Sequence, residues 1–119
     1  MKFTDTHEWI NVQDGVGTVG VTDYAQKELG DIVFVELPKI GSEVKKGQEA
    51  VVLESTKAAA DVYSPVSGKI VEVNTALNDS SELVNNFPER DGWLFKLALS
   101  NPDEFDSLMD KESYQAKLP

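Results

Sequence analysis

The sequence predicts a mostly β protein, a small barrel or sandwich, with a short internal helix and a C-terminal helix. Three observations support this. Apolar residues cluster or alternate in short stretches, turn signals separate these stretches at close intervals, and only two segments have the period of a helix. The length of 119 residues corresponds to one ordinary domain, so we expect a single domain over residues 1–119.

A β-hairpin and then a helix are expected first. Trp9–Val12 is apolar, Asp14-Gly15 is a turn signal, and Val16–Val21 alternates valine with small residues, a pattern typical of a hairpin. Thr22 is a suitable N-cap, and Gly30 is a signal for the end of a helix. The side chains of this helix expected to face inward are Tyr24, Ala25 and Leu29.

The middle of the chain predicts further strands, because β-branched and aromatic residues dominate its apolar stretches. The expected strands are Ile32–Leu37, Ala50–Glu54, Ile70–Val73 and Trp93–Leu99. The turns and loops between them are expected at Gly41–Gly47, Ser64–Gly68 and Asn74–Asn86.

The last segment changes to a helical period. Asn101 and Pro102 suit the start of a helix, and Phe105, Leu108 and Met109 follow at the spacing of one helical face. We expect an amphipathic helix that covers an open end of the β core, in preference to one that binds a partner.

The composition excludes several classes of function. With 11 basic and 21 acidic residues, the net charge of −10 disfavours binding to nucleic acid or to an anionic membrane. The absence of cysteine excludes disulfides and thiolate sites, and a single histidine, His7, leaves little basis for a metal site. Met1–Asp5 leads into polar sequence without a secretory signal, so we expect a cytoplasmic protein that does not enter a membrane.

One lysine lies in an unusual context. Lys57 is centred in a stretch of small residues between two strand-like segments, which places it at the tip of a hairpin where another protein can reach it. No apolar pocket that would lower its pKa for Schiff-base chemistry is evident from the sequence.

This context resembles the lipoyl-lysine hairpin of the glycine cleavage system H protein family. The similarity covers nearly the whole chain in order. The segments that carry it are His7–Trp9, Gly20–Gln26, Leu29–Pro38, Glu54–Ala58, Asp61–Asn74, Asp91–Lys96 and Asn101-Pro102. The chain departs from the family at Thr56, where valine is common, and at Asn86–Arg90, which leaves its docking preferences open.

The resemblance implies a lipoyl-domain-like barrel-sandwich hybrid with lipoic acid in amide linkage on Lys57. It implies a monomeric, non-catalytic carrier that takes the aminomethyl group of glycine from a pyridoxal-phosphate-dependent glycine decarboxylase (P protein) to a tetrahydrofolate-dependent aminomethyltransferase (T protein). A dihydrolipoyl dehydrogenase (L protein) would then reoxidise the arm, and lipoate-attaching enzymes would load Lys57. In such a carrier the cofactor supplies the chemistry, and the protein supplies attachment and presentation.

The resemblance also suggests further site residues. Glu54 and Ser55 are candidates for recognition by the lipoylating enzyme; the alternative is that they are ordinary turn residues. Thr6, Glu8, Val21 and Asp61 are candidates for a cleft that shelters the loaded arm, in which Glu8 would hold the protonated amine; the alternative for Glu8 is a surface acid. His7 is expected to be structural, and Trp9, Trp93 and Phe95 are expected in the core.

Alternative functions remain at this stage. An H-like protein that serves mainly as a lipoyl donor for other complexes would have the same sequence features. A biotin carrier domain uses the same kind of hairpin, but its lysine is usually flanked by methionines, where Thr56 and Ala58 stand here. For an enzyme, the sequence offers no nucleophile or acid–base pair that we can nominate.

Overall fold

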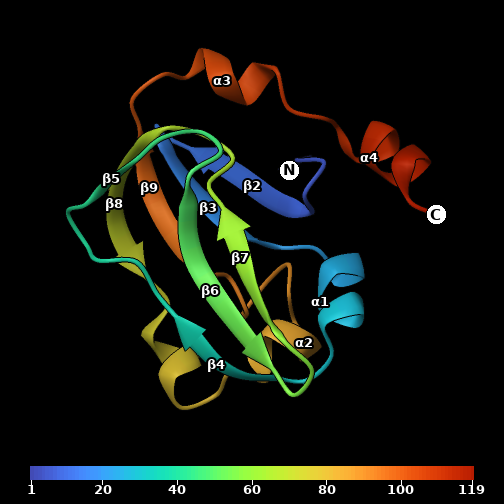
Figure 1. The fold of residues 1–119 in the computed structure, drawn as a ribbon. Coiled ribbons are helices and arrows are strands. Elements are labelled where there is room, and N and C mark those ends of the chain that lie inside the picture. The colour runs from blue at the N-terminus through green and yellow to red at the C-terminus, as the bar shows by residue number, and fades with distance from the viewer.

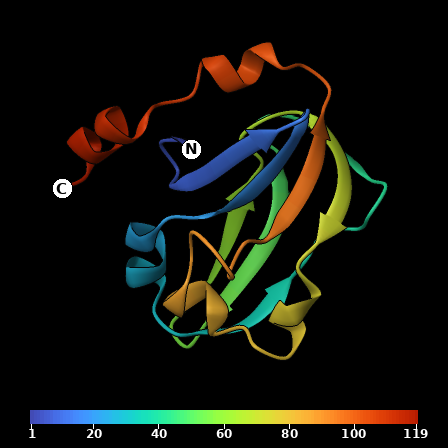
Figure 2. The ribbon, with the colours of Figure 1, turned by 180° about the vertical axis from the view of Figure 1, so that it is seen from behind.

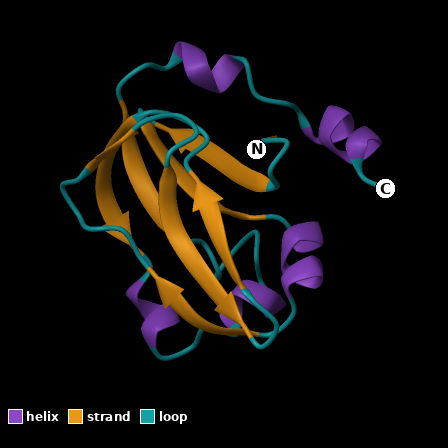
Figure 3. Ribbon diagram, in the orientation of Figure 1, coloured by secondary structure: helices purple, strands orange, loops and turns teal.

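The computed structural model describes residues 1–119 as two antiparallel β-sheets with short helices around them (Figures 1 and 3). The six-stranded sheet has the order β1-β2-β3-β9-β8-β5, and the three-stranded sheet has the order β4-β6-β7. The strands are β1 (Lys2–Phe3), β2 (Glu8–Gln13), β3 (Val16–Val21), β4 (Ile32–Glu36), β5 (Glu43–Val44), β6 (Glu49–Ser55), β7 (Ala59–Tyr63), β8 (Gly68–Val73) and β9 (Phe95–Leu99). The helices are α1 (Asp23–Leu29), the 3₁₀ turn η1 (Thr75–Asn78), α2 (Leu83–Asn86), α3 (Asp103–Asp106) and α4 (Lys111–Lys117).

The first hairpin and the first helix agree with the sequence prediction. Asp14 and Gly15 form a two-residue turn with positive φ angles of 54° and 78°, as a twisted hairpin prefers. Thr22 caps α1 by accepting a hydrogen bond from the Ala25 N–H, and Gly30 ends the helix. Gly20 lies so close to Trp9 that an added Cβ would come within 2.7 Å of the indole ring, so the hairpin admits no larger residue there.

The main hydrophobic core fills the space between the two sheets. Ile10, Val19 and Leu97 come from the larger sheet, and Leu53 and Val62 come from the smaller one. Burying these side chains removes apolar surface from water and is the main driving force that holds the two sheets together. Ala25 and Leu29 of α1 pack against this core as predicted, although no residue of α1 is fully buried.

A second, smaller cluster consists of Phe3, Trp9 and Tyr114. It joins the first strand of the chain to α4, and the rings of Phe3 and Tyr114 stack with their centroids 4.7 Å apart. Trp9 and Phe95 are buried as expected, whereas Trp93 is only half-buried, because it packs at the edge of this smaller cluster.

The structure confirms a helical C-terminus, but Phe105, Leu108 and Met109 do not lie on a single helix as the spacing predicts. The chain forms two short helices, α3 and α4; α3 lies beyond the end of β9, and α4 lies near the N-terminal segment (Figures 1 and 2). Between them, Met109 makes a β-bridge to Phe3. Phe105 and Leu108 pack against the main core, but Met109 packs against the smaller cluster, so the predicted apolar face is divided between two sites.

The sequence predicts a loop at Asn74–Asn86, but this region contains η1 and α2. Leu77 and Val84 anchor these short helices in the main core. They lie at the same end of the molecule as the β6–β7 hairpin tip, and α2 is in contact with α1. No helix is long and apolar enough to span a bilayer.

Candidate functional site

Lys57 stands at the tip of the hairpin that joins β6 to β7. The Ser55 N–H donates to the Ala58 carbonyl (2.8 Å), which closes the turn. The Ser55 hydroxyl oxygen accepts hydrogen bonds from the N–H groups of Lys57 and Ala58, both at 3.1 Å. Ser55 therefore shapes the turn, which is a local structural role of the kind that serine hydroxyls often have.

The tip is open to solvent around the lysine. Thr56, Lys57 and Ala58 are exposed, and Glu54 is an exposed residue of the same hairpin. Because its neighbours are small, the Lys57 amine can be approached by a second protein without displacing any bulky side chain.

The hairpin tip nevertheless rests on the body of the protein. The Thr56 N–H donates to the Asp31 carbonyl, at 3.0 Å, in the link between α1 and β4. The aliphatic part of the Lys57 side chain passes over Gly30, where an added Cβ would lie 3.3 Å from the Lys57 Cε. Gly30 has φ 84° and ψ −163°, a conformation that is essentially restricted to glycine.

The four residues proposed for the cleft lie together. Thr6, Glu8, Val21 and Asp61 line one cavity of about 330 Å³ between the larger sheet, α1 and β7. Its other lining residues are His7, Tyr24, Ala25, Glu28, Leu29, Ala60 and Val62. The lining is therefore partly apolar and includes the carboxylates of Glu8, Glu28 and Asp61.

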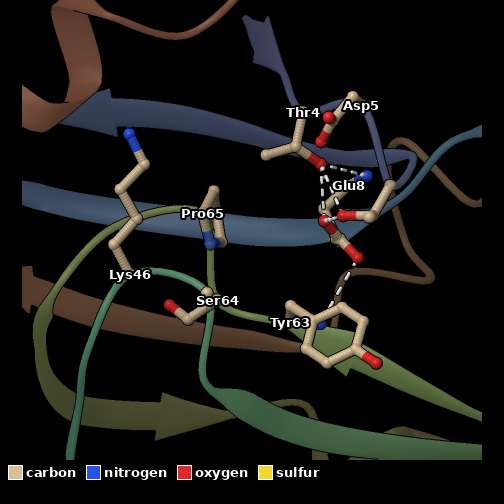
Figure 4. Close-up of a pocket in the computed structure, with 9 residues that line it drawn as sticks. Thr4, Asp5, Glu8, Lys46, Tyr63, Ser64 and Pro65 are labelled. Atoms are coloured by element: carbon tan, nitrogen blue, oxygen red, sulfur yellow. Dashed lines mark hydrogen bonds between the residues drawn. The ribbon is translucent and has the colours of Figure 1, made fainter.

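Glu8 is buried, with 2% of its surface exposed, and is not the surface acid of the alternative interpretation. Its Oε1 accepts hydrogen bonds from the hydroxyls of Thr4 and Thr6, and its Oε2 accepts one from the Tyr63 N–H at 3.3 Å (Figure 4). Burial raises the pKa of the Glu8 carboxyl, although these three hydrogen bonds act in the opposite direction.

Glu8 also forms part of the wall of a second cavity. Figure 4 shows this space, in which the side chains of Thr4, Asp5 and Lys46 surround the segment Tyr63–Pro65. The Glu8 carboxylate thus lies between two hollows in the surface, and a cation in either could approach a buried negative charge.

His7 takes part in a hydrogen-bond network that the sequence did not indicate. Its backbone has a positive φ of 73°, and its Nδ1 lies 2.8 Å from the Tyr114 hydroxyl. The same hydroxyl lies 2.7 Å from the Thr22 Oγ1. Tyr114 of α4 therefore supports a residue of the cavity wall. The only local indication of this arrangement in the sequence is Asp110, whose side chain caps the start of α4 by accepting a hydrogen bond from the Ser113 N–H.

Comparison with known proteins gives a consistent result. The family model described as "Glycine cleavage H-protein" matches residues 1–119. The chain is 57% identical to the glycine cleavage system H protein of Rhodospirillum rubrum over 98% of this chain and 93% of that protein. It is 54% identical to the protein of the same name from Thermotoga maritima, over 96% and 92%. A crystal structure of a glycine cleavage system H protein from Mycobacterium marinum matches with a TM-score of 0.89 and 35% identity, covering 98% of this chain and 94% of that one.

Proposed function

Because this chain belongs to the glycine cleavage H-protein family, we propose that it is the lipoyl carrier of a glycine cleavage system and carries lipoic acid in amide linkage on Lys57. The observation that supports this most directly is the position of Lys57, exposed at the tip of an ordered hairpin. Small, exposed neighbours leave room for an enzyme that attaches the group and for the partners that later use it.

The residues present fit a lipoyl group. When bound, the group supplies the disulfide and thiol chemistry that takes up the aminomethyl group of glycine and passes it on. The protein contributes the anchoring amine of Lys57, and the Ser55 hydroxyl fixes the turn that presents this amine. Glu54, exposed beside the turn, is available for recognition by the lipoate-attaching enzyme.

The cavity formed by Thr6, Glu8, Val21 and Asp61 would shelter the cargo. A protonated amine entering it would meet the Glu8 carboxylate, which the hydroxyls of Thr4 and Thr6 hold in place. Charge-assisted hydrogen bonds of this kind are stronger away from bulk water. The apolar lining residues, Val21 among them, would help to exclude the water that decomposes the cargo.

The partners in this proposal are the other components of the system: glycine decarboxylase, aminomethyltransferase and dihydrolipoyl dehydrogenase. The chain would work as a monomeric carrier in the cytoplasm, and the partner enzymes would perform the catalysis. The net charge of −10 favours encounter with basic surfaces on those enzymes.

The test is mass spectrometry of the chain produced in lipoate-fed cells. We expect one lipoyl group, found by peptide analysis on Lys57 and lost in Lys57→Arg. The matched control, Lys69→Arg, replaces another exposed lysine and should retain the group. Lipoylation that persists in Lys57→Arg, or a biotin adduct in its place, would contradict the proposal. Glycine-dependent reduction of NAD⁺ with the purified partner enzymes then separates glycine cleavage from a role as lipoyl donor only.

A further inference from the structure

The side chain of Asn85 holds the short link between α1 and β4, against which the tip of the lysine hairpin packs. Asn85 of α2 accepts a hydrogen bond from the Ile32 N–H through its Oδ1, at 2.9 Å. Its Nδ2 donates to the Gly30 carbonyl at 2.9 Å and to the Gln26 side chain at 3.0 Å. Asn85 therefore fixes backbone groups on both sides of Asp31, more than 50 positions away in the sequence.

Asp31 is the residue of the link that bonds to the hairpin tip. Its carbonyl accepts the Thr56 N–H at 3.0 Å, and the neighbouring Gly30 lies under the Lys57 side chain. Glycine is conformationally permissive, so a link that contains Gly30 needs external support to keep one shape. Asn85 gives this support at both ends of the link, and the Ser81 hydroxyl adds a hydrogen bond to the Ile32 carbonyl at 2.9 Å.

We propose that Asn85 is a positioning residue for Lys57. It acts through the Gly30–Ile32 link and sets the position in which the hairpin tip meets a lipoate-attaching enzyme. The proposal rests on the function proposed above. In the attachment step the neutral Lys57 Nζ attacks the carboxyl carbon of a lipoyl acyl-adenylate; an amide bond forms, adenylate leaves with the electron pair, and the amine proton goes to solvent. If the hairpin tip occupies the binding-competent position for only a fraction of the time, the apparent dissociation constant for the lipoate-attaching enzyme rises by the inverse of that fraction.

The experiment compares Asn85→Ala with Asn74→Ala. Asn74 is a matched control because its side-chain amide also donates two hydrogen bonds to backbone carbonyls, those of Asp91 and Trp93, which lie outside the hairpin and its support. Amide hydrogen exchange is measured at Thr56, and the kinetics of attachment are measured with a purified lipoate–protein ligase, lipoate and ATP. Urea unfolding gives the loss of stability of each variant.

We expect exchange at Thr56 to accelerate at least about fivefold in Asn85→Ala, because the variant loses three hydrogen bonds and the net loss of one alone implies a factor of about this size. The KM for the carrier in lipoylation should rise about fivefold, with kcat within twofold of the parent. Asn74→Ala should lose comparable stability while keeping the parental exchange rate and KM. Asn85→Asp, which keeps the acceptor for Ile32 but not the donor to Gly30, should change both quantities in the same direction and gives a second test if Asn85→Ala does not fold.

Parental exchange at Thr56 and a parental KM in both Asn85 variants would overturn the proposal. Equal changes in Asn74→Ala would overturn it too, because they would show a general effect of lost stability. Failure of the parent chain to accept lipoate on Lys57 would instead contradict the proposed function. In that case the exchange measurement, which needs no lipoate, still decides whether Asn85 positions the hairpin tip.

Discussion

Gly30→Ala is the substitution that most directly tests the support under the lysine hairpin. Gly30 combines a backbone conformation that side chains avoid, φ 84° and ψ −163°, with a position under the Lys57 side chain. Alanine adds one methyl group at this point. The expected loss of stability therefore has two separable sources, backbone strain and contact with the lysine.

The strain is the larger source. Holding a residue other than glycine in this region of φ/ψ space costs about 1–3 kcal/mol. The added Cβ would lie 3.3 Å from the Lys57 Cε, which is close, but Lys57 is exposed and its side chain can move aside at little cost. We therefore expect a loss of about 1–3 kcal/mol in the free energy of unfolding, with a fall in Tm of about 3–5 °C per kcal/mol for a domain of this size.

Urea unfolding at 25 °C of the parent, Gly30→Ala, Lys57→Ala and the double variant measures both sources. If strain dominates, the double variant loses the sum of the two single losses within about 0.5 kcal/mol. A loss below about 0.5 kcal/mol in Gly30→Ala would refute the claim that this position requires glycine. Recovery of stability in the double variant would show that contact with the lysine, and not the backbone, is responsible.

Three further predictions concern the cavity and its support. Glu8→Ala should shorten the lifetime of the aminomethyl-loaded form, measured as release of formaldehyde and ammonia, and leave lipoylation of Lys57 intact; equal release rates would mean that Glu8 does not hold the cargo. Because burial raises the pKa of Glu8, the stability it contributes is present below the ordinary carboxyl pKa and is lost as the pH rises through the raised native pKa. In urea unfolding between pH 4 and 7, the free energy of unfolding of Glu8→Gln should therefore increase relative to that of the parent as the pH rises. A difference in free energy that stays constant with pH would contradict this. Tyr114→Phe removes the hydroxyl contacts to Thr22 and His7 but keeps the stacking on Phe3, so it should cost about 1–2 kcal/mol in urea unfolding; a variant as stable as the parent would exclude this role.

The elements that the sequence predicts well are those with a local signal. The Asp14-Gly15 turn, the Thr22 cap and the β6–β7 hairpin each depend on neighbouring residues, and the structure contains all three. The motif around Lys57 also lies within one short segment, which explains why its place at a hairpin tip could be foreseen.

The parts that could not be predicted depend on contacts between distant segments. The apolar spacing of Phe105, Leu108 and Met109 is genuine, but the pairing of Met109 with Phe3 interrupts the helix that this spacing predicts. Nothing near Asn85 in the sequence shows that its side chain reaches Gly30 and Ile32.

The cleft shows the same limit. The family resemblance named Thr6, Glu8, Val21 and Asp61, and these residues do line one cavity. The hydrogen bonds from Thr4 and Thr6 to Glu8 are local, but the one from the Tyr63 N–H depends on how β2 and β7 approach each other, and the sequence carries no local sign of that approach.

The small cluster of Phe3, Trp9 and Tyr114 has a consequence for the order of folding. Phe3 and Tyr114 are separated by nearly the whole chain, so closing this cluster carries the entropy cost of a very long loop. The β2–β3 hairpin can form from adjacent residues, but Trp9 has no aromatic partner from α4 until Tyr114 has been synthesised. The support that Tyr114 gives to His7 is therefore completed late, and a chain interrupted before this residue would keep its first hairpin while the wall of the cavity lacked its hydrogen bond.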